Sequence, residues 1–371
     1  MRLGVLSYDY APAIGGMGIV AKRYVDRMRQ QFPEHTIIVI APGTAADDRV
    51  SAIARLRYLK SGGCPIFSLI LSMALPQIIR KHRLDVLHVH AGSGGVFLLR
   101  KPQCPLVVTA HHTYRQEAEF VFNDRPVKKF MKSIMGILER RTYRLADRII
   151  AVSADTAAAL IEDYGIPQSR IRVIENPVNL PPEGELFHPK DFTSILYVGR
   201  LEERKGCMTL LRAMVLLRNH FPSIRLTVIG SNLLGSSVQR FIVDNQLEAH
   251  IQLLGFVDQG RYDAERRRAG IVVVPSLMEG FGLVAAEAMA DGACVVGADA
   301  PGLRSLIRDK ETGLLFKSGD AACCVAAMEW ALGNTAATTT IGRHAAEDVR
   351  RRCDVSKRTR DLERIISSTK F

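Results

Sequence analysis

The chain has 371 residues, of which 47% are hydrophobic and 24% are charged, and its formal net charge is +12. This length predicts two domains, and the apolar fraction is sufficient for two cores. The sequence has no apolar run of about 18 residues, which argues against a membrane-spanning helix. Its seven cysteines are odd in number and lack CxxC spacing, which favours reduced cytosolic thiols.

Strand patterns alternate with helical patterns along the whole chain, and this alternation predicts parallel sheets flanked by helices. The opening residues read as a first strand without the apolar core of a secretory signal, so we expect a cytoplasmic protein. In chain order, the predicted strands are Leu3–Ser7, Thr36–Ile40, Asp85–Val89, Leu106–Thr109, Arg148–Val152, Ile171–Ile174, Ile195–Val198, Arg225–Ile229, Ile251–Leu254, Ile271–Val274 and Cys294–Val296.

A segment rich in proline and polar residues, from Asn176 to Asp191, predicts the connection between two domains. We therefore predict a first domain at residues 1–176, a linker at 177–191, a second domain at 192–349 and a C-terminal helix at 350–371.

The glycine segment Gly15, Gly16, Met17 and Gly18 follows the first strand and opens a helix near Ile19. Glycines at such a place let backbone N–H groups cradle an anion. The segment is not GxGxxG, and a plain tight turn between strand and helix explains it equally well.

Histidines gather at the ends of two predicted strands of the first domain. His111 and His112 close the strand that ends in Thr109, and such a position lies at the ligand-binding edge of an α/β sheet. His111 could donate a hydrogen bond to a hydroxyl or take part in proton transfer. His88 and His90 share one face of a strand, but no further ligands at suitable spacing accompany them, so we expect no metal site.

Positive charge is concentrated in the first half of the chain. Residues 1–180 hold 25 of the 50 Lys and Arg residues but only 15 of the 38 Asp and Glu residues. The densest patch runs from Arg125 to Arg148, and its apolar residues recur at helical spacing: Phe130, Ile134, Ile137, Leu138 and Leu145. Two interpretations stay open: a basic amphipathic helix on an anionic membrane surface, or an ordinary helix whose apolar stripe lies in the core.

The segment YVGRLEERKG opens the second domain in the same manner as the glycine segment opens the first. Arg200 follows the end of a strand, and Lys205 comes just before a helix. A fork of arginine donors beside a mobile ammonium suits a diphosphate, although surface charges beside a turn are the simpler explanation of this segment taken alone.

The segment Ile271–Ala298 predicts one strand–helix–strand unit with two carboxylates near its glycine turn, Glu279 and Glu287. Pro275 should end the strand, the helix should begin at Leu283, and Gly292 should stop it. Backbone N–H groups at the start of such a helix attract phosphate. Glu287 has two acceptor oxygens for the hydroxyls of a ribose, and Glu279 could face a sugar; both could also be solvated surface charges.

These segments, in this order, resemble the retaining GT-B glycosyltransferases of family 4 that share a Glu-x7-Glu motif, here Glu279 to Glu287. The other matching segments are GGMG at Gly15, VVTAHHTY around His111, AVSADTAAALIEDYGIPQSRIRVIENPVN and YVGRLEERKG. The resemblance implies two Rossmann-like domains with parallel sheets facing an interdomain cleft. A departure is the stretch APGLRSLI from Ala300 to Ile307, where the group often has a glycine pair followed by Pro-Glu.

The resemblance also implies roles for individual residues. Arg200 and Lys205 would neutralise the donor diphosphate, Glu287 would hold the ribose, and His111 and Glu279 would contact the sugar. The implied donor site comprises Gly15, Gly16, Gly18, Arg200, Lys205, Gly230, Glu279, Gly280, Phe281, Gly282, Leu283 and Glu287.

The function implied by the resemblance is hexosyl transfer, with retention and without a metal or another cofactor, from a UDP- or GDP-sugar. A glycan or lipid-linked hydroxyl would accept the sugar, and the enzyme would work in the cytoplasm or on the inner membrane face. One alternative is an epimerase or hydrolase of the same fold. Another is a basic nucleic-acid-binding protein, which the 6% of aromatic residues disfavours because stacking platforms are lacking.

Overall fold

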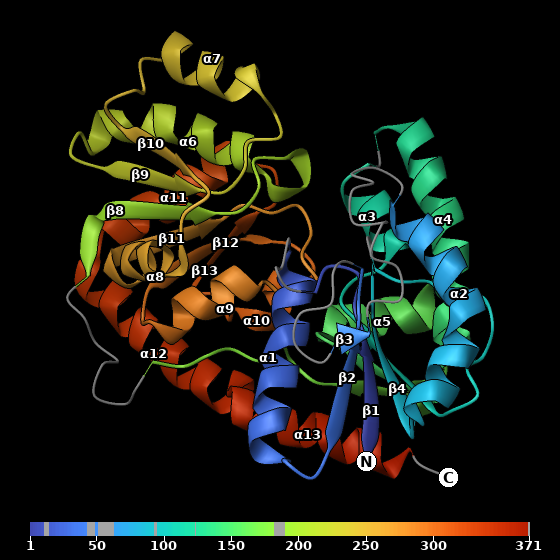
Figure 1. Ribbon diagram of the computed structural model, residues 1–371. Helices are drawn as coiled ribbons and strands as arrows, with labels where there is room; N and C mark the ends of the chain where they lie inside the picture. The colour runs from blue at the N-terminus through green and yellow to red at the C-terminus, as the bar shows by residue number, and fades with distance from the viewer. Residues whose placement is uncertain are drawn as a thin grey trace. The chain divides into compact units, whose positions relative to one another are not determined.

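The computed structural model describes residues 1–10, 15–42, 49–50, 63–92, 95–122, 124–181 and 190–369, and for residues 49–50 and 63–66 it describes the backbone alone. These residues form two compact units (Figure 1). Unit 1 consists of Met1–Pro177 together with Val355–Phe371, and unit 2 consists of Val178–Asp354. Of the predicted linker, residues 182–189 lie outside the described part of the chain.

Unit 1 contains a fully parallel sheet with the strand order β3-β2-β1-β4-β5-β6-β7 among the described residues. Its strands are β1 Arg2–Leu6, β2 Thr36–Ile40, β3 Arg49–Val50, β4 Val86–Ala91, β5 Leu106–Ala110, β6 Arg148–Ala151 and β7 Ile171–Val173. Strands β4 and β5 are buried along their whole length, as expected for parallel strands with helices on both faces.

Helices connect these strands, and one further helix arrives from the end of the chain. They are α1 Gly16–Gln31, α2 Gly63–His82, α3 Tyr114–Phe120, α4 Pro126–Leu145, α5 Ala154–Glu162, the short 3₁₀ helix η2 Gln168–Arg170 and α13 Val355–Ser368. Helix α13 packs on α1: Ser356 accepts a hydrogen bond from Arg27, and Leu362 and Ile366 are buried. The C-terminal helix therefore begins at Val355, and residues 350–353 belong to the preceding helix.

Unit 2 repeats this architecture with the strand order β10-β9-β8-β11-β12-β13, again fully parallel within the described residues. Its strands are β8 Asp191–Val198, β9 Arg225–Ile229, β10 Ile251–Gly255, β11 Ala269–Val274, β12 Cys294–Asp299 and β13 Leu314–Lys317. Its helices are η4 Glu203–Lys205, α6 Cys207–His220, α7 Ser236–Asp244, α8 Gln259–Arg268, α9 Leu283–Ala290, α10 Leu303–Leu306, α11 Ala321–Gly333 and α12 Thr335–Cys353.

In both sheets, the strand order indicates which edge is expected to bind a ligand. In an open α/β sheet, the loops that follow two neighbouring strands diverge where the strand order reverses, and they leave room for a ligand there. The reversal lies between β1 and β4 in unit 1 and between β8 and β11 in unit 2. The residues that follow these strands are therefore the first candidates for function. No helix within the described ranges combines the length and apolar character that crossing a bilayer requires.

A buried carboxyl group fastens α4 to the rest of unit 1. Glu139 lies on the inner side of α4 and accepts hydrogen bonds from the Tyr114 backbone N–H (2.8 Å) and from the hydroxyls of Tyr143 and Tyr164. Burial raises the pKa of Glu139 to about 8, although these three donors favour the ionised form. Protonated Glu139 therefore stabilises the fold, and its ionisation opposes it.

This raised pKa predicts a pH-dependent stability difference between wild type and Glu139→Gln, which mimics the protonated acid. The stabilisation is complete below the ordinary pKa of 4.5 and is lost as pH rises to about 8. We expect wild type to lose about 3–5 kcal/mol relative to the variant across this window, at about 1.36 kcal/mol per pKa unit. Urea unfolding of both proteins at several pH values measures the difference.

The difference between the two proteins is the necessary quantity because other groups titrate in the same range. Burial lowers the pKa of His88 and His111 to about 3, so their contribution is lost as pH falls below about 6.5. That opposite trend is common to wild type and variant and cancels in the difference. Parallel stability profiles for the two proteins would show that Glu139 does not titrate in this window.

Candidate functional site

The strongest candidate site of unit 2 lies where the turns that follow β8 and β11 meet. These strands are parallel neighbours, with Ile195 opposite Ile271, so their carboxyl ends share one edge of the sheet. Arg200 and Lys205 follow β8, and Glu279 follows β11. Strand β11 ends at Val274 and α9 begins at Leu283, as Pro275 and the helix-forming sequence predict.

The two turns are joined by backbone contacts. The Leu277 N–H donates a hydrogen bond to the Arg204 carbonyl at 2.9 Å. Gly206 has a φ of 61°, and a Cβ added there would lie 1.9 Å from the Pro275 carbonyl oxygen. Only glycine permits this approach, so Gly206 seats the Lys205 turn directly on the turn after β11.

Lys205 and Glu279 form an ion pair across this junction. Lys205 Nζ donates to Glu279 Oε1 at 2.6 Å, and Ser276 Oγ donates to the same oxygen at 2.7 Å. Burial alone would raise the pKa of Glu279, but Lys205, Arg204 and Ser276 outweigh burial and hold this pKa at about 2. Burial lowers the pKa of Lys205, and Glu279 opposes that change. Glu279 is therefore a carboxylate at neutral pH, with Lys205 as its counter-ion.

Arg200 is the most exposed cation of this junction. Its side chain is 48% exposed, against 14% for Arg204 and 20% for Lys205. Arg200 and Arg204 both contact Glu202 Oε1, at 3.0 and 3.2 Å. An anionic ligand at this edge would therefore compete with Glu202 for Arg200 and with Glu279 for Lys205.

Glu287 lies within the first two turns of α9 and is held by helix α8. Its Oε2 accepts a hydrogen bond from the Tyr262 hydroxyl and lies 3.4 Å from Arg266 Nη1. Arg266 also donates to Asp291 at 2.5 Å, and its guanidinium lies over the Tyr262 ring. Glu287 is only 5% exposed, so it is an oriented carboxylate inside a charge network and not a solvated surface charge.

The segment Ala300–Ile307, where the sequence departs from the family pattern, packs on the Glu279 backbone. The Glu279 N–H donates to the Pro301 carbonyl at 3.0 Å. Gly282 caps α9 in a left-handed conformation, Phe281 is buried, and Leu283 is partly exposed. Because the Phe281 side chain is only 3% exposed, the part of this residue expected to meet a ligand is its backbone.

Gly230 lies one strand away from the junction, directly after β9. Its N–H donates to the Gly255 carbonyl at 2.8 Å, and a Cβ added to it would lie 2.1 Å from the Gly199 carbonyl oxygen. The residue therefore lets the turns after β8, β9 and β10 lie close together at the same sheet edge.

The predicted glycine segment of unit 1 forms the start of α1. Gly15 is the N-cap residue, and the helix begins at Gly16. A Cβ on Gly18 would lie 2.0 Å from the Asp9 carbonyl oxygen, so close packing against the segment that follows β1 already requires glycine at this position. This contact supports the strand–helix turn that the sequence offered as one explanation.

His111, directly after β5, stacks on the buried His90 of β4. His90 Nδ1 and His111 Nε2 lie 2.9 Å apart, and His88 Nε2 contacts Thr109 Oγ1 at 2.8 Å. Burial lowers the pKa of His111 and His88 to about 3, and that of His90 falls well below its usual value for the same reason. His111 is therefore neutral, which suits hydrogen bonding to a hydroxyl better than donation of a proton from an imidazolium.

The glycine segment and His111 lie at the same edge of the unit 1 sheet. They follow β1 and β5, and β4 lies between those two strands. His90 Nε2 is buried and has no hydrogen-bond partner among the described atoms. This makes His90, which the sequence suggested only as half of a pair with His88, a member of the same group as His111.

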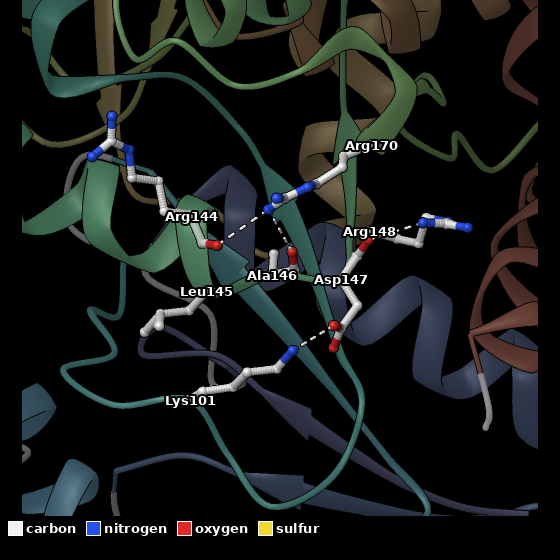
Figure 2. Close-up of a pocket in the computed structure, with 7 residues that line it drawn as sticks. All are labelled: Lys101, Arg144, Leu145, Ala146, Asp147, Arg148 and Arg170. Atoms are coloured by element: carbon white, nitrogen blue, oxygen red, sulfur yellow. Dashed lines mark hydrogen bonds and ion pairs between the residues drawn. The ribbon is translucent and has the colours of Figure 1, made fainter.

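A surface pocket of about 340 Å³ lies at the opposite edge of the unit 1 sheet, where β6 begins (Figure 2). Its positive charges are already engaged: Lys101 pairs with Asp147 at 2.6 Å, and Arg170 donates to the carbonyls of Arg144 and Ala146. In Figure 2 the Arg144 guanidinium points away from these groups. The carboxyl end of α4 also disfavours an anion there, so this pocket does not compete with the strand-end sites.

Tyr262, Arg266 and Ser276, which contact Glu287 or Glu279, were not predicted as site residues from the sequence. Tyr262 and Arg266 come from α8, which precedes β11 and carries no motif of its own. Their one available signal was the spacing of four residues, which puts them on one helix face. In the described part of the chain, no group of three or more His, Cys, Asp or Glu side chains is arranged to hold a metal ion.

Comparison with known proteins gives matches over both units. Residues 14–181 match the family described as Glycosyltransferase Family 4, and residues 183–348 match Glycosyl transferases group 1. A D-inositol 3-phosphate glycosyltransferase of Pseudarthrobacter chlorophenolicus is 31% identical over 281 residues, which are 71% of this chain and 66% of that protein. The one from Salinispora arenicola is 32% identical over 294 residues, covering 70% and 64%.

Solved structures resemble the whole chain. Sucrose-phosphate synthase from Thermosynechococcus elongatus has a TM-score of 0.79 at 21% identity and covers 99% of this chain and 98% of its own. HepE from Anabaena, in complex with UDP and glucose, has a TM-score of 0.70 at 17% identity and covers 99% and 100%. These likenesses confirm the predicted GT-B fold. The chain spans less than two thirds of the length of most of the curated relatives that it matches.

Proposed function

Because the chain belongs to the glycosyltransferases, with one glycosyltransferase family model matching residues 14–181 and another matching residues 183–348, we propose that it transfers a hexosyl group from a nucleoside diphosphate sugar. The receiving group is an acceptor hydroxyl, and the anomeric configuration is retained. The observation that carries the proposal is the junction in unit 2, where Lys205 and Glu279 pair beside the start of α9 and Glu287 is held nearby by Tyr262 and Arg266.

In this proposal, the donor diphosphate lies over Arg200, Lys205 and the first backbone N–H groups of α9. When the glycosidic bond breaks, negative charge develops on the leaving phosphate, and preorganised cations stabilise this charge without reorganising. Helix N-termini favour the same charge. These residues compensate the charge, so the proposal needs no metal ion and no other cofactor.

The two glutamates have separate proposed tasks. Glu287 accepts hydrogen bonds from the ribose hydroxyls, since contacts of its Oε2 with α8 orient the carboxylate and a carboxylate accepts two donors at once. Glu279 contacts the transferred sugar, with one oxygen fixed by Lys205 and Ser276. His111 of unit 1, which is neutral, hydrogen-bonds a sugar hydroxyl.

Retention is proposed to proceed by attack of the acceptor hydroxyl on the face that the diphosphate leaves. The departing phosphate oxygen takes the proton of the acceptor, and the new bond to the anomeric carbon forms as the bond to phosphate breaks. No side chain then has to form a covalent intermediate.

Two acceptor classes follow from the comparisons and from the charge of the chain. The curated relatives named D-inositol 3-phosphate glycosyltransferase suggest a phosphorylated inositol. The excess of positive charge in residues 1–180 suggests a glycan or lipid-linked acceptor in the synthesis of glycolipid, lipopolysaccharide or cell-envelope polysaccharide. The second class would require the enzyme to work at a membrane surface.

A thermal-shift screen with UDP-, GDP- and ADP-sugars identifies the donor. A ligand at 100 times its Kd stabilises the folded state by about 2.7 kcal/mol, so we expect one nucleotide family to raise the Tm by several degrees. Release of nucleoside diphosphate is then measured with and without each acceptor class. We expect release that depends on the acceptor and an α-linked product from an α-linked donor.

Two outcomes contradict the proposal. Equal release with and without acceptor would assign the site to hydrolysis or epimerisation. If none of the sugar nucleotides stabilises the protein, the proposed donor site is contradicted. If the protein then binds random DNA in a salt-sensitive manner, the nucleic-acid interpretation is favoured.

A further inference from the structure

Helix α4 of unit 1 turns its apolar side chains toward solvent. In a globular protein, the apolar stripe of a surface helix ordinarily faces the core. The residues that α4 buries are Gly136, Glu139, Thr142 and Tyr143, three of which carry polar side chains. Its exposed apolar side chains, here called the outer face of α4, are Val127, Phe130, Met131, Ile134 and Ile137, and they are 46% to 72% exposed. The predicted apolar stripe is therefore divided: Leu138 and Leu145 are partly buried against core residues, whereas Phe130, Ile134 and Ile137 face solvent.

Polar contacts fix the rotation of α4 about its axis, so the outer face points to solvent because of the way that unit 1 folds. Glu139 accepts hydrogen bonds from the Tyr114 N–H of α3 and from the Tyr164 hydroxyl, both outside α4. Thr142 Oγ1 accepts a hydrogen bond from the Leu98 N–H at 2.9 Å. Turning the apolar side chains inward would break these buried bonds, which is costly. The helix thus presents its outer face in one defined orientation.

Other helices of unit 1 also carry exposed apolar side chains. Phe120, at the end of α3, is 43% exposed, and α3 packs on α4. Leu69 and Met73 of α2 are 52% and 70% exposed. Helices α2 and α4 both bind the segment Phe97–Leu99, whose N–H groups donate to Ser68, Thr142 and Ser72. Exposed apolar side chains gathered on one part of a protein mark an interaction site.

Positive charge surrounds the outer face. Lys128, Arg141 and Arg144 are exposed on α4 itself, and Arg125 is exposed at its N-cap. Lys132 is paired with Glu117 at 2.8 Å, and the exposed carboxylates that come shortly before α4 in the sequence are Glu119 and Asp124. Cations along an apolar helix face match an anionic bilayer, in which acyl chains lie just below phosphate groups.

We propose that the outer face of α4 docks unit 1 onto an anionic lipid bilayer, with Phe130 and Ile134 at the boundary between headgroups and acyl chains. The arginines and lysines of α4 then contact lipid phosphates, and α4 lies in the plane of the surface. This docking does not depend on the donor site of unit 2, so it can be tested without substrate.

The first test is co-sedimentation of the full chain with vesicles of phosphatidylcholine alone and of phosphatidylcholine with phosphatidylglycerol. We expect strong partitioning only onto the anionic vesicles. Phe130→Ser/Ile137→Ser should weaken it by at least about tenfold, since each lost apolar contact contributes substantially to binding. The matched control is Leu216→Ser, which removes an exposed leucine of α6 in unit 2 (49% exposed) and should change nothing.

The second test reports where the outer face lies. The one tryptophan of the chain, Trp330, is replaced by phenylalanine, and Phe130→Trp supplies a probe on α4. We expect a blue shift and protection from aqueous quencher on anionic vesicles. This readout separates insertion of the outer face from attraction of the basic first half as a whole, which would leave the probe in water.

Three outcomes would overturn the proposal: equal partitioning onto both vesicle types, equal partitioning of wild type and Phe130→Ser/Ile137→Ser, or an unshifted tryptophan on vesicles that bind the chain. Analytical ultracentrifugation tests whether a second copy of this chain, and not a bilayer, binds the outer face. A dimer that dissociates in Phe130→Ser/Ile137→Ser, with no vesicle binding by wild type, would assign the outer face to a second copy of this chain.

Discussion

Replacing Lys205 with methionine is expected to lower kcat/KM for sugar transfer by at least about a hundredfold, the usual effect of removing one preorganised donor from a developing charge. Methionine keeps the length and apolar stem of the side chain but removes the ammonium group that lies 2.6 Å from Glu279. The effect should appear mainly in kcat, because charge on the leaving phosphate develops only in the transition state. Initial rates of nucleoside diphosphate release with acceptor measure it.

Lys317→Met is the matched control, since Lys317 is a lysine of the same unit with a side chain that is 78% exposed. Its rates should equal those of wild type. Wild-type turnover by Lys205→Met, with its fold intact by circular dichroism, would contradict the proposed role.

The same substitution has a structural effect that has to be separated from the catalytic one. It leaves the Glu279 carboxylate with Ser276 but without its counter-ion, and we expect a loss of about 2 kcal/mol of stability, below the usual 3–5 for fully buried pairs. Lys205→Met/Glu279→Gln removes both charges and should recover much of this loss. It should recover none of the activity, and full recovery of activity would show that Lys205 acts only by holding Glu279.

Replacing Glu287 with glutamine is expected to raise the KM for the donor by about 10- to 100-fold, since a hydrogen bond to a charged group contributes about 1.5–3 kcal/mol. The amide keeps the shape of the side chain but accepts through one oxygen only. The effect on kcat should be smaller, because the ribose is bound equally in the ground and transition states. Steady-state kinetics with varied donor concentration separates the two constants.

A donor lacking the ribose 2′-hydroxyl sharpens this prediction. Wild type should discriminate strongly against the 2′-deoxy donor, and Glu287→Gln should discriminate much less. Tyr262→Phe, which removes the hydroxyl that positions Glu287, should fall between them. Glu347→Gln, an exposed glutamate on α12, is the control. Unchanged discrimination in Glu287→Gln would assign the ribose to other residues.

Most strands could be predicted from the sequence because parallel strands buried on both faces consist of continuous apolar runs. Thr36–Ile40 and Arg225–Ile229 were predicted to the residue, and the other predicted strands differ from the observed ones by one to four residues at one or both ends. Strands β3 and β13 were missed. The four residues of β13, Leu314–Lys317, are too few to show a period, and pairing with β12 makes them a strand.

The motif residues of the unit 2 junction could also be predicted, because glycines, Pro275 and the helix start mark turns in the local sequence. The residues that contact them could not be predicted. Tyr262 and Arg266 reach Glu287 from 25 and 21 residues away, and the pairing of Lys205 with Glu279 spans 74 residues. Contacts of this kind depend on strand order, which periodicity alone does not reveal.

The orientation of α4 is a second feature that hydrophobic periodicity alone could not predict. Its apolar spacing predicts a helix correctly, but spacing does not tell which face is buried. Glu139 and Thr142 face inward because Tyr114, Tyr164 and Leu98 supply hydrogen-bond donors for them, and those donors become visible only in the folded unit.

The central claim is that the nucleoside diphosphate of the donor lies at the junction after β8 and β11 in unit 2. Hydrogen–deuterium exchange of the full chain, with and without a saturating concentration of the nucleotide found in the thermal-shift screen, tests it most directly. We predict slowed exchange in residues 199–206 and 276–290, which carry Lys205, Glu279 and Glu287. Unchanged exchange in both segments at saturation would contradict the claim.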